Sequence, residues 1–264
     1  MLVVVAGQDD GEARELAGRW APWDAAVLTC EDLSTAGWRY FPDDPEGSAA
    51  MIAGRSVAAG EITGVLTRLM HVSEPELRRI AREDRAYAAA EMTAFLRSWL
   101  SGLRCPVLNR PTSTCLSAPG WRREQTAYVA AQLGIPVQPV TWRLEPGSGV
   151  VEEQPSPPDV TVAVVGARCL GSAADGALAA QARRLAWAAG VDLLAVRFSE
   201  TETGFELHGV DPWADVSSPE IADAILEHFL PASEQEASFP TPKRGRPDRL
   251  SLPPGSRERS GHEG

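Results

Sequence analysis

Lysine is almost absent from this chain of 264 residues. Only one of its 25 basic side chains, Lys243, is a lysine, and the others are arginines. A mechanism in which a lysine of a folded domain forms a Schiff base or grips a nucleotide phosphate is therefore excluded. An excess of positive charge is absent as well, since 36 acidic residues leave a net charge of −11. Neutralising phosphates requires clustered cations, so we expect no nucleic-acid partner.

Long hydrophobic runs are also missing. No stretch approaches the roughly 18 uninterrupted apolar residues that a membrane span requires. The first apolar run, residues 2–6, is short, lacks a basic flank and leads into Gly-Gln-Asp-Asp, so it indicates a strand and not a signal peptide. We expect a cytoplasmic protein without a membrane partner.

Cysteine is sparse and widely spaced. None of Cys30, Cys105, Cys115 and Cys169 forms a C-x-x-C pair or has a neighbouring histidine, which does not favour a zinc site. Four reduced, mostly buried thiols are the simpler interpretation. An unrelated thiol enzyme remains the third and least favoured function, because no histidine near Cys105 or Cys115 in sequence could activate either thiol.

The hydrophobic pattern indicates an α/β fold. A strand at 2–6, a helix at 8–20 and a strand at 25–30 make the βα beginning of a parallel sheet. Further helices are predicted at 56–70, 75–103, 121–133, 173–189 and 218–230. Further strands are predicted at 107–108, 160–166, 191–198 and 204–210, the last two forming a hairpin.

Proline and glycine divide the chain. Residues 145–158 are too rich in both to form a core element, so we predict a linker there. This leaves an N-terminal α/β domain at 1–144 and a second αβ unit at 159–230. Residues 231–264 are rich in Ser, Pro, Glu and Arg, and we predict a disordered tail.

Two segments carry candidate functional residues. Asn109 and Arg110 follow the short strand at 107–108, where an arginine can fork onto a carboxylate or phosphate. A turn tied by an arginine salt bridge explains the same residues. Asp211, at the end of the last strand, suits a metal or ligand group, but a single carboxylate is no cation site and a capped turn explains it too. No Gly-x-Ser-x-Gly motif and no Ser-His-Asp arrangement is found.

The order of several short motifs resembles the ATP-grasp superfamily, in particular RimK-like carboxylate–amine ligases that modify ribosomal peptides. The motifs are Tyr-Ala-Ala-Ala-Glu at 87–91, Val-Leu-Asn-Arg-Pro at 107–111, Leu-Gly-Ile-Pro-Val-Gln-Pro-Val-Thr at 133–141, the strands at 159–166 and 189–198, and the segment 205–212. The resemblance covers most of residues 1–230. It implies a pre-ATP-grasp-like α/β domain followed by a truncated ATP-grasp-like α+β unit.

The chain departs from that family where the nucleotide would bind. The family's small lobe, with its phosphate-holding lysines, would lie between Thr141 and Val160, where the chain has only the linker. The family's Glu-x-Asn magnesium motif falls on Gly209, Val210 and Asp211, and its aligned aspartate falls on Arg197. Mg²⁺ requires several hard oxygen ligands, so we expect no metal, no cofactor and no catalytic residues.

Two functions from different classes follow. The first is a degenerate ATP-grasp-like protein, a pseudoenzyme that acts as an accessory component of a biosynthetic system and binds a protein partner, a peptide or a small molecule. The second is a divergent ATP-dependent carboxylate–amine ligase in which arginines replace the lysines. The candidate ligand-binding surface is the crevice at the carboxyl ends of the strands, near Arg68, Asn109, Arg110 and Asp211.

Overall fold

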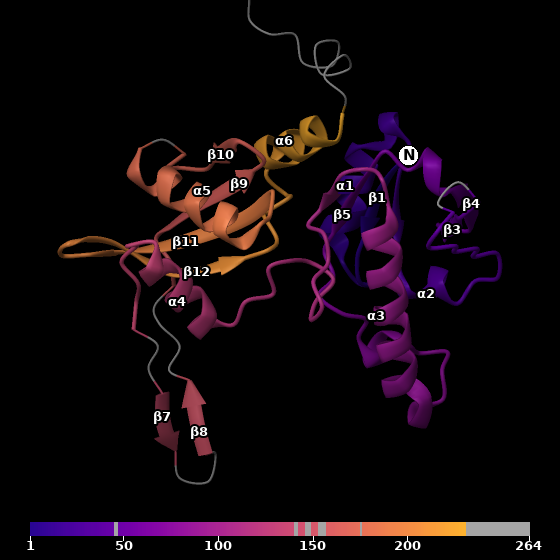
Figure 1. Cartoon of the computed structure of the whole chain (residues 1–264), viewed down its shortest axis with the longest axis horizontal. Coiled ribbons are helices and arrows are strands. Elements are labelled where there is room, and N and C mark those ends of the chain that lie inside the picture. The colour runs from indigo at the N-terminus through magenta and orange to yellow at the C-terminus, as the bar shows by residue number, and fades with distance from the viewer. Residues whose placement is uncertain (45–46, 140–141, 146–148, 153–156, 175, 231–264) are drawn as a thin grey trace, which may run out of the picture. The chain divides into compact units, whose positions relative to one another are not determined.

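A computed structural model of the chain describes residues 1–44, 47–139, 142–145, 149–152, 157–174 and 176–230 (Figure 1). The tail predicted at 231–264 lies outside the described residues. The described part is a mixed α/β structure with one parallel and one antiparallel four-stranded sheet, so the predicted fold class is confirmed. None of the described helices is long and apolar enough to cross a membrane.

The first sheet is parallel and lies in the N-terminal part of the chain. Its strand order is β2-β1-β5-β6, which comprises β2 (Ala25–Leu28), β1 (Leu2–Val5), β5 (Gly64–Thr67) and β6 (Val107–Leu108). Every residue of β1 is buried, as a central strand covered on both faces requires. Helix α1 (Gly11–Arg19) makes the crossover from β1 to β2, and Asp10 caps it by accepting a hydrogen bond from the backbone N–H of Ala13 at 2.9 Å.

Helix α3 (Arg85–Gly102) is the longest helix and packs on this sheet. Its buried residues Leu96, Trp99 and Leu100 belong to one hydrophobic cluster with Val3 and Val65 of the strands. The predicted helix at 75–103 is therefore correct only in its second part. Before Arg85 the chain forms the short 3₁₀ turns η3 (Glu74–Glu76) and η4 (Arg82–Asp84).

The predicted helix at 56–70 is wrong. The segment contains β4 (Arg55–Ala58), the 3₁₀ turn η2 (Ala59–Glu61) and β5, and β4 pairs with β3 (Ala49–Ile52) as an antiparallel hairpin. The apolar spacing of the segment fits a helical stripe, but Val65 and Leu66 are buried beside β1 instead. Tertiary pairing here prevails over a local pattern that suits both structures.

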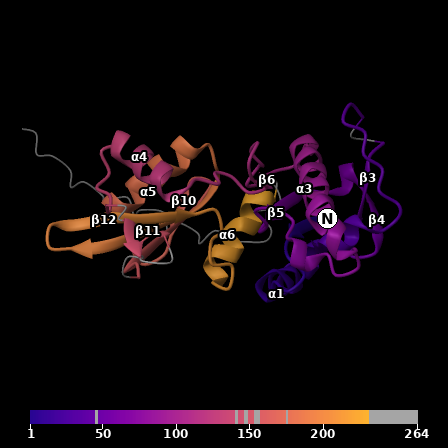
Figure 2. The same cartoon turned by 90° about the horizontal axis from the view of Figure 1, so that it is seen from below.

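The second sheet is antiparallel, with the order β10-β9-β11-β12. Its strands are β10 (Arg168–Leu170), β9 (Val160–Val165), β11 (Leu193–Thr201) and β12 (Gly204–Asp211). Figure 2 shows α4 (Arg123–Gln132) and α5 (Ala177–Ala189) on one side of the β11–β12 ribbon. On that face Val196 and Phe198 of β11 join Leu185 of α5 in the second hydrophobic cluster.

The remaining elements connect or flank these sheets. They are η1 (Ala21–Trp23), α2 (Cys30–Leu33) and α6 (Pro219–Phe229). Phe229 of α6 contacts Trp20 edge to face, with ring centroids 6.2 Å apart.

A short hairpin begins just before the segment predicted as a linker at 145–158 and extends into it. Strands β7 (Trp142–Glu145) and β8 (Gly149–Glu152) pair antiparallel in a two-stranded sheet of their own. This regular structure differs from the prediction. It stands where the resemblance places the small lobe of an ATP-grasp enzyme.

Candidate functional site

The carboxyl edge of the parallel sheet is the first place to look for a ligand, because open sheets bind ligands where the crossover direction reverses. The reversal lies between β1 and β5, and Arg68 stands there directly after β5. Its side chain is only 10% exposed and forms ion pairs with Asp10 at 3.0 Å and with Glu12 at 2.7 Å. The charge of Arg68 is thus neutralised by carboxylates at the beginning of α1.

Glu76 fills the adjoining space. A Cβ added at Gly7, directly after β1 and its neighbour Ala6, would lie 2.9 Å from the Glu76 carboxylate oxygen Oε1. Only glycine allows that side chain to approach the turn so closely. The Glu76 side chain therefore occupies the space beside Gly7 at this edge of the sheet.

Asn109 lies at the end of β6 and is buried. Its amide nitrogen Nδ2 donates to the carbonyl oxygens of Ala118 at 2.9 Å and Leu193 at 2.6 Å. Its Oδ1 accepts from the backbone N–H of Leu193 at 2.9 Å. These bonds fasten the end of β6 to the beginning of β11 and leave the amide without a free donor.

Arg110 and Asp211 also bind the backbone. The Arg110 guanidinium donates to the carbonyls of Leu103 at 3.1 Å and Cys105 at 3.0 Å, and so satisfies acceptors beyond the end of α3. Asp211 Oδ1 accepts from the N–H of Trp213 at 2.9 Å, an Asx turn at the end of β12. No hydrogen bond or ion pair joins any two of the four predicted site residues within the described ranges, so their joint ligand role stays a prediction.

The face of β11 and β12 that carries Arg197 also carries Gly209 and Asp211, which the sequence resemblance aligns with magnesium ligands of the ATP-grasp superfamily. Arg197 pairs in register with Thr161 of β9 and Gly209 of β12, and Asp211 lies one step further along the same face. The Arg197 atom Nη2 lies 3.8 Å from the point where a Cβ at Gly209 would stand. The guanidinium therefore extends into the space that a side chain at position 209 would enter.

A magnesium ion does not fit these residues. A cation stands at the first aligned position and a hydrogen atom replaces the side chain at the second, which leaves the Asp211 carboxylate alone, and Mg²⁺ prefers near-octahedral oxygen ligands. Within the part of the chain that the structure describes, no group of three or more His, Cys, Asp or Glu side chains could hold a metal ion. The Nε atom of Arg197 is buried without a hydrogen-bond partner there.

His208 extends the polar character of this region. The register of β11 and β12 shifts between Arg197 and Phe198, so that Phe198 pairs with Leu207 and His208 becomes the extra residue of a β-bulge. The His208 atom Nδ1 lies 3.4 Å from the hydroxyl of Ser199. Burial lowers the pKa of His208, and the charges of Arg197 and Arg123 lower it further, whereas Asp159 opposes them.

The environments of Cys30 and Cys105 disfavour the thiolate form. Burial raises the pKa of Cys30 to about 12, with a further contribution from the Glu76 carboxylate. Burial also raises the pKa of Cys105. Because the thiolate is the nucleophile, these shifts argue against a catalytic role for either cysteine.

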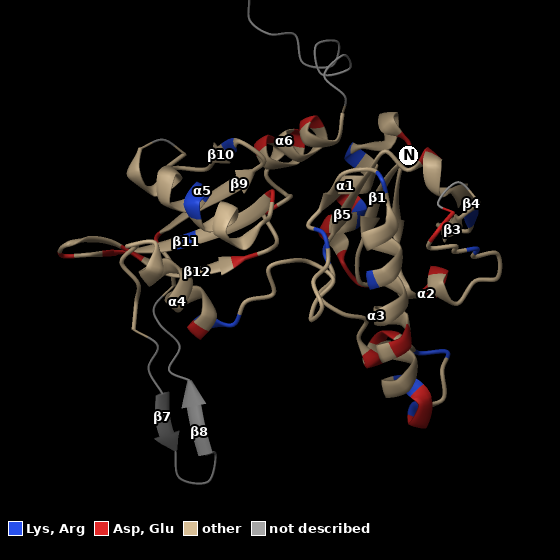
Figure 3. Cartoon of the chain, in the orientation of Figure 1, with Lys and Arg blue, Asp and Glu red and all other residues tan. Residues whose placement is uncertain are grey.

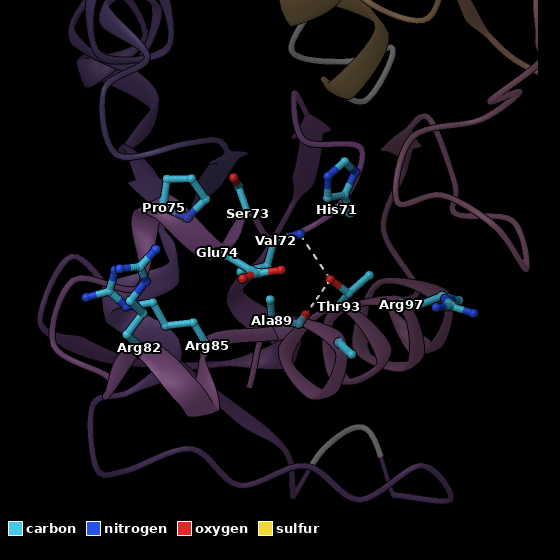
Figure 4. Close-up of a pocket in the computed structure, with 11 residues that line it drawn as sticks. His71, Val72, Ser73, Glu74, Pro75, Arg82, Arg85, Ala89, Thr93 and Arg97 are labelled. Carbon is cyan, nitrogen blue, oxygen red and sulfur yellow. Dashed lines mark hydrogen bonds between the residues drawn. The ribbon is translucent and has the colours of Figure 1, made fainter. Parts of the chain in front are cut away.

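A large cavity lies beside α3, where the sequence analysis named no site. It measures about 920 Å³ and is lined by arginines, small residues and the segment after β5 (Figure 4). We call it the α3 groove, and its lining consists of His71, Val72, Ser73, Glu74, Pro75, Arg82, Arg85, Ala89, Ala90, Thr93 and Arg97.

The side chain of Thr93 links α3, which forms the floor of the groove, to the segment after β5, which forms its wall. Thr93 accepts a hydrogen bond from the backbone N–H of Val72 at 3.0 Å and donates to the carbonyl of Ala89 at 2.7 Å. Arg82 and Arg85 lie at one end, Arg97 lies at the other, and Glu74 lies between them (Figure 4). A signal was present in the sequence: Arg85, Ala89, Thr93 and Arg97 recur every four residues and so share one face of a helix.

No family model and no curated protein matches the chain. Solved structures do match. The macrocyclase MdnC of Microcystis aeruginosa MRC, bound with precursor peptide MdnA, superposes with a TM-score of 0.63 at 12% identity, over 88% of this chain and 100% of that one. The ATP-grasp ligase PsnB, in complex with a phosphomimetic variant of its minimal precursor, Mg and ADP, gives 0.62 at 12%, over 87% and 98%.

A third structure agrees with these two. A Chryseobacterium gregarium RiPP-associated ATP-grasp ligase, in complex with ADP and a leader and core peptide, gives a TM-score of 0.57 at 10% identity, over 86% of this chain and 96% of that one. At such low identity the likeness shows a shared fold. The predicted resemblance is confirmed at that level, and the chain has the fold of the ATP-grasp ligases.

Proposed function

We propose that this ATP-grasp-fold protein is a non-catalytic, peptide-binding component of a peptide-modification system. The observation that carries the proposal is the face of β11 and β12, where the Arg197 guanidinium extends toward Gly209. The two positions that resemble the family's carboxylate ligands thus hold a positive charge and no side chain.

The electrostatics of that face oppose a metal–nucleotide complex. Acyl-phosphate chemistry needs a divalent cation to bridge the phosphates and neutralise their developing charge. The Arg197 guanidinium repels that cation, and the burial of its Nε atom reduces the screening by water. The single lysine, Lys243, lies outside the described residues, so no lysine of the described structure supports the phosphates.

The peptide partner is proposed from the structural neighbours. MdnC was solved with its precursor peptide, and PsnB with a variant of its minimal precursor. A chain that shares their fold and lacks the metal ligands can retain the binding of a peptide while a separate ligase performs the chemistry. A protein partner of this kind fits an accessory role.

Thermal unfolding with nucleotide tests the proposal. We expect the melting temperature to change by less than about 1 °C with ATP and Mg²⁺ together, compared with either alone. A ligand at a hundredfold excess over its Kd stabilises the native state by about 2.7 kcal/mol, which shifts the melting temperature by roughly 5–10 °C in a chain of this size.

PsnB, solved with Mg and ADP, provides the positive control for the assay. A shift of several degrees that requires both Mg²⁺ and ATP would overturn the proposal. The alternative function, a divergent ATP-dependent carboxylate–amine ligase, would then take its place.

A further inference from the structure

The α3 groove is large and carries positive charge. It is not part of the β11–β12 face on which the proposed function rests. Its volume of about 920 Å³ lies within the range of ligand sites in proteins. Three arginines line it in a chain whose net charge is −11, so the groove differs in sign from the molecule as a whole. Figure 3 shows that basic and acidic stretches alternate near the beginning of α3.

Several donors in the groove have no acceptor in the protein. The side chain of Arg82, which lines the groove, makes no hydrogen bond or ion pair within the described ranges. Arg97 donates through Nη1 to the carbonyl of Ser113 at 2.6 Å, which leaves its other terminal nitrogen available, and its buried Nε has no partner in the described structure. A guanidinium presents five N–H donors, and its preferred acceptors are carboxylates and phosphates.

The spacing of these charges favours an extended ligand. Arg85 and Arg97 are twelve residues apart on one helix, which corresponds to about 18 Å along its axis. An extended peptide rises about 3.3 Å per residue, so five to six residues cover that distance. A compact metabolite with one anionic group would reach only one end.

The middle of the groove selects against negative charge. Glu74 lies between the two arginine ends (Figure 4). Ala89 and Ala90 contribute only methyl groups to the floor of the groove. The hydroxyl of Thr93 already accepts a hydrogen bond from Val72 and donates one to Ala89. An acidic side chain placed there would face the like charge of Glu74. Glu83 and Asp84, neighbours of the arginines in sequence, do not line the groove.

We propose that the α3 groove binds an extended peptide segment of about six residues that carries an acidic side chain at each end and none in the middle. This deepens the proposed function, on which it rests for the peptide nature of the ligand, by naming where a peptide docks and which side chains it presents. The arginine ends recognise the two carboxylates, and the alanine floor accommodates small side chains between them.

Amide chemical shifts of the ¹⁵N-labelled full chain provide the test. The probe is the blocked peptide Glu-Ala-Ser-Ala-Ala-Glu, and the control is Ala-Ala-Glu-Glu-Ser-Ala, which has the same composition and charge. We expect the probe to shift the amides of Val72 and Ala90 and to bind at least fivefold more tightly than the control. Its affinity falls as salt rises from 50 to 500 mM, because exposed charges are screened.

Variants locate the binding. Arg82→Gln removes the charge of a side chain that makes no hydrogen bond or ion pair within the described residues, and it weakens the probe about fivefold. Ala90→Phe fills the floor without changing the charge and weakens it more than tenfold. Arg183→Gln on α5, also an exposed arginine, is the matched control and leaves the affinity unchanged.

The outcomes separate this inference from the proposed function. Equal affinity for both peptides, equal loss in Arg82→Gln and Arg183→Gln, or shifts confined to other amides would overturn the groove assignment. Adding ATP and Mg²⁺ to the same samples tests the other proposal independently. A response to nucleotide together with intact probe binding refutes the non-catalytic role and leaves the groove assignment standing.

Discussion

The arginines at the carboxyl edge of the parallel sheet differ from those on β11 and beside α3. Arg68 forms two ion pairs with the beginning of α1, and Arg110 donates to carbonyls near the end of α3. The side chains of Arg82 and Arg197, by contrast, make no hydrogen bond or ion pair in the part of the chain that the structure describes. Arg68 and Arg110 stabilise the fold, whereas the guanidinium donors of Arg82 and Arg197 are available to a ligand.

This difference shows why a residue type at a promising position is a weak guide to a site. All four side chains carry the same charge in the same chain, and what separates them is whether the protein supplies an acceptor. Arginine enrichment in the sequence therefore predicted neither group.

The largest expected effect is a loss of stability when a side chain that binds the protein's own backbone is removed. Asn109→Ala should lower the free energy of unfolding by about 3 kcal/mol, because it removes three buried hydrogen bonds and leaves the N–H and C=O of Leu193 unsatisfied. Denaturant unfolding measures this change. Gln132→Ala, which removes an exposed amide from α4, should stay within about 0.5 kcal/mol. Equal effects of the two variants would contradict the role assigned to Asn109.

A smaller effect is expected from the ion pairs of the same edge. Arg68→Ala should destabilise the protein by about 2 kcal/mol, since its removal leaves Asp10 and Glu12 without their shared cation in a site that is only partly solvated. Arg78→Ala is the control, because the Arg78–Asp9 pair is 68% and 81% exposed. That variant should change stability by less than about 0.5 kcal/mol. If Arg68→Ala is equally mild, the edge is an available ligand site and the comparison fails.

The smallest effect concerns the titration of His208. Burial first, and then Arg197 and Arg123, lower its pKa, so the neutral imidazole is favoured in the folded state. The unfolded chain then binds more protons, and stability decreases as the pH falls from about 6.5 toward the lowered pKa of the folded state. Arg197→Gln should raise the pKa of His208 in an NMR titration. An unchanged pKa would show that the Arg197 charge does not reach this imidazole.

The elements predicted best were those whose local pattern and tertiary environment agree. The buried run at the start of β1, the alanine-rich helix α5 and the β11–β12 hairpin all followed from hydrophobic periodicity and turn residues. The helix predicted at 56–70 failed at β5, whose apolar spacing also fits a helix, and the sequence did not indicate the β7–β8 hairpin, of which β8 lies within the segment predicted as a linker. Strand pairing decided both, and the pairing partner lies far away in sequence for β5.

For the candidate site, too, some features followed from the sequence and others only from the folded structure. Composition alone established that the described structure holds no lysine, and the motif order indicated an ATP-grasp fold with an arginine at position 197. The partners of Arg68, Asn109 and Arg110, and the cavity along α3, required the folded chain. Local sequence sets charge and helical spacing, whereas hydrogen-bond acceptors and cavities arise from segments that meet only when hydrophobic burial brings them together.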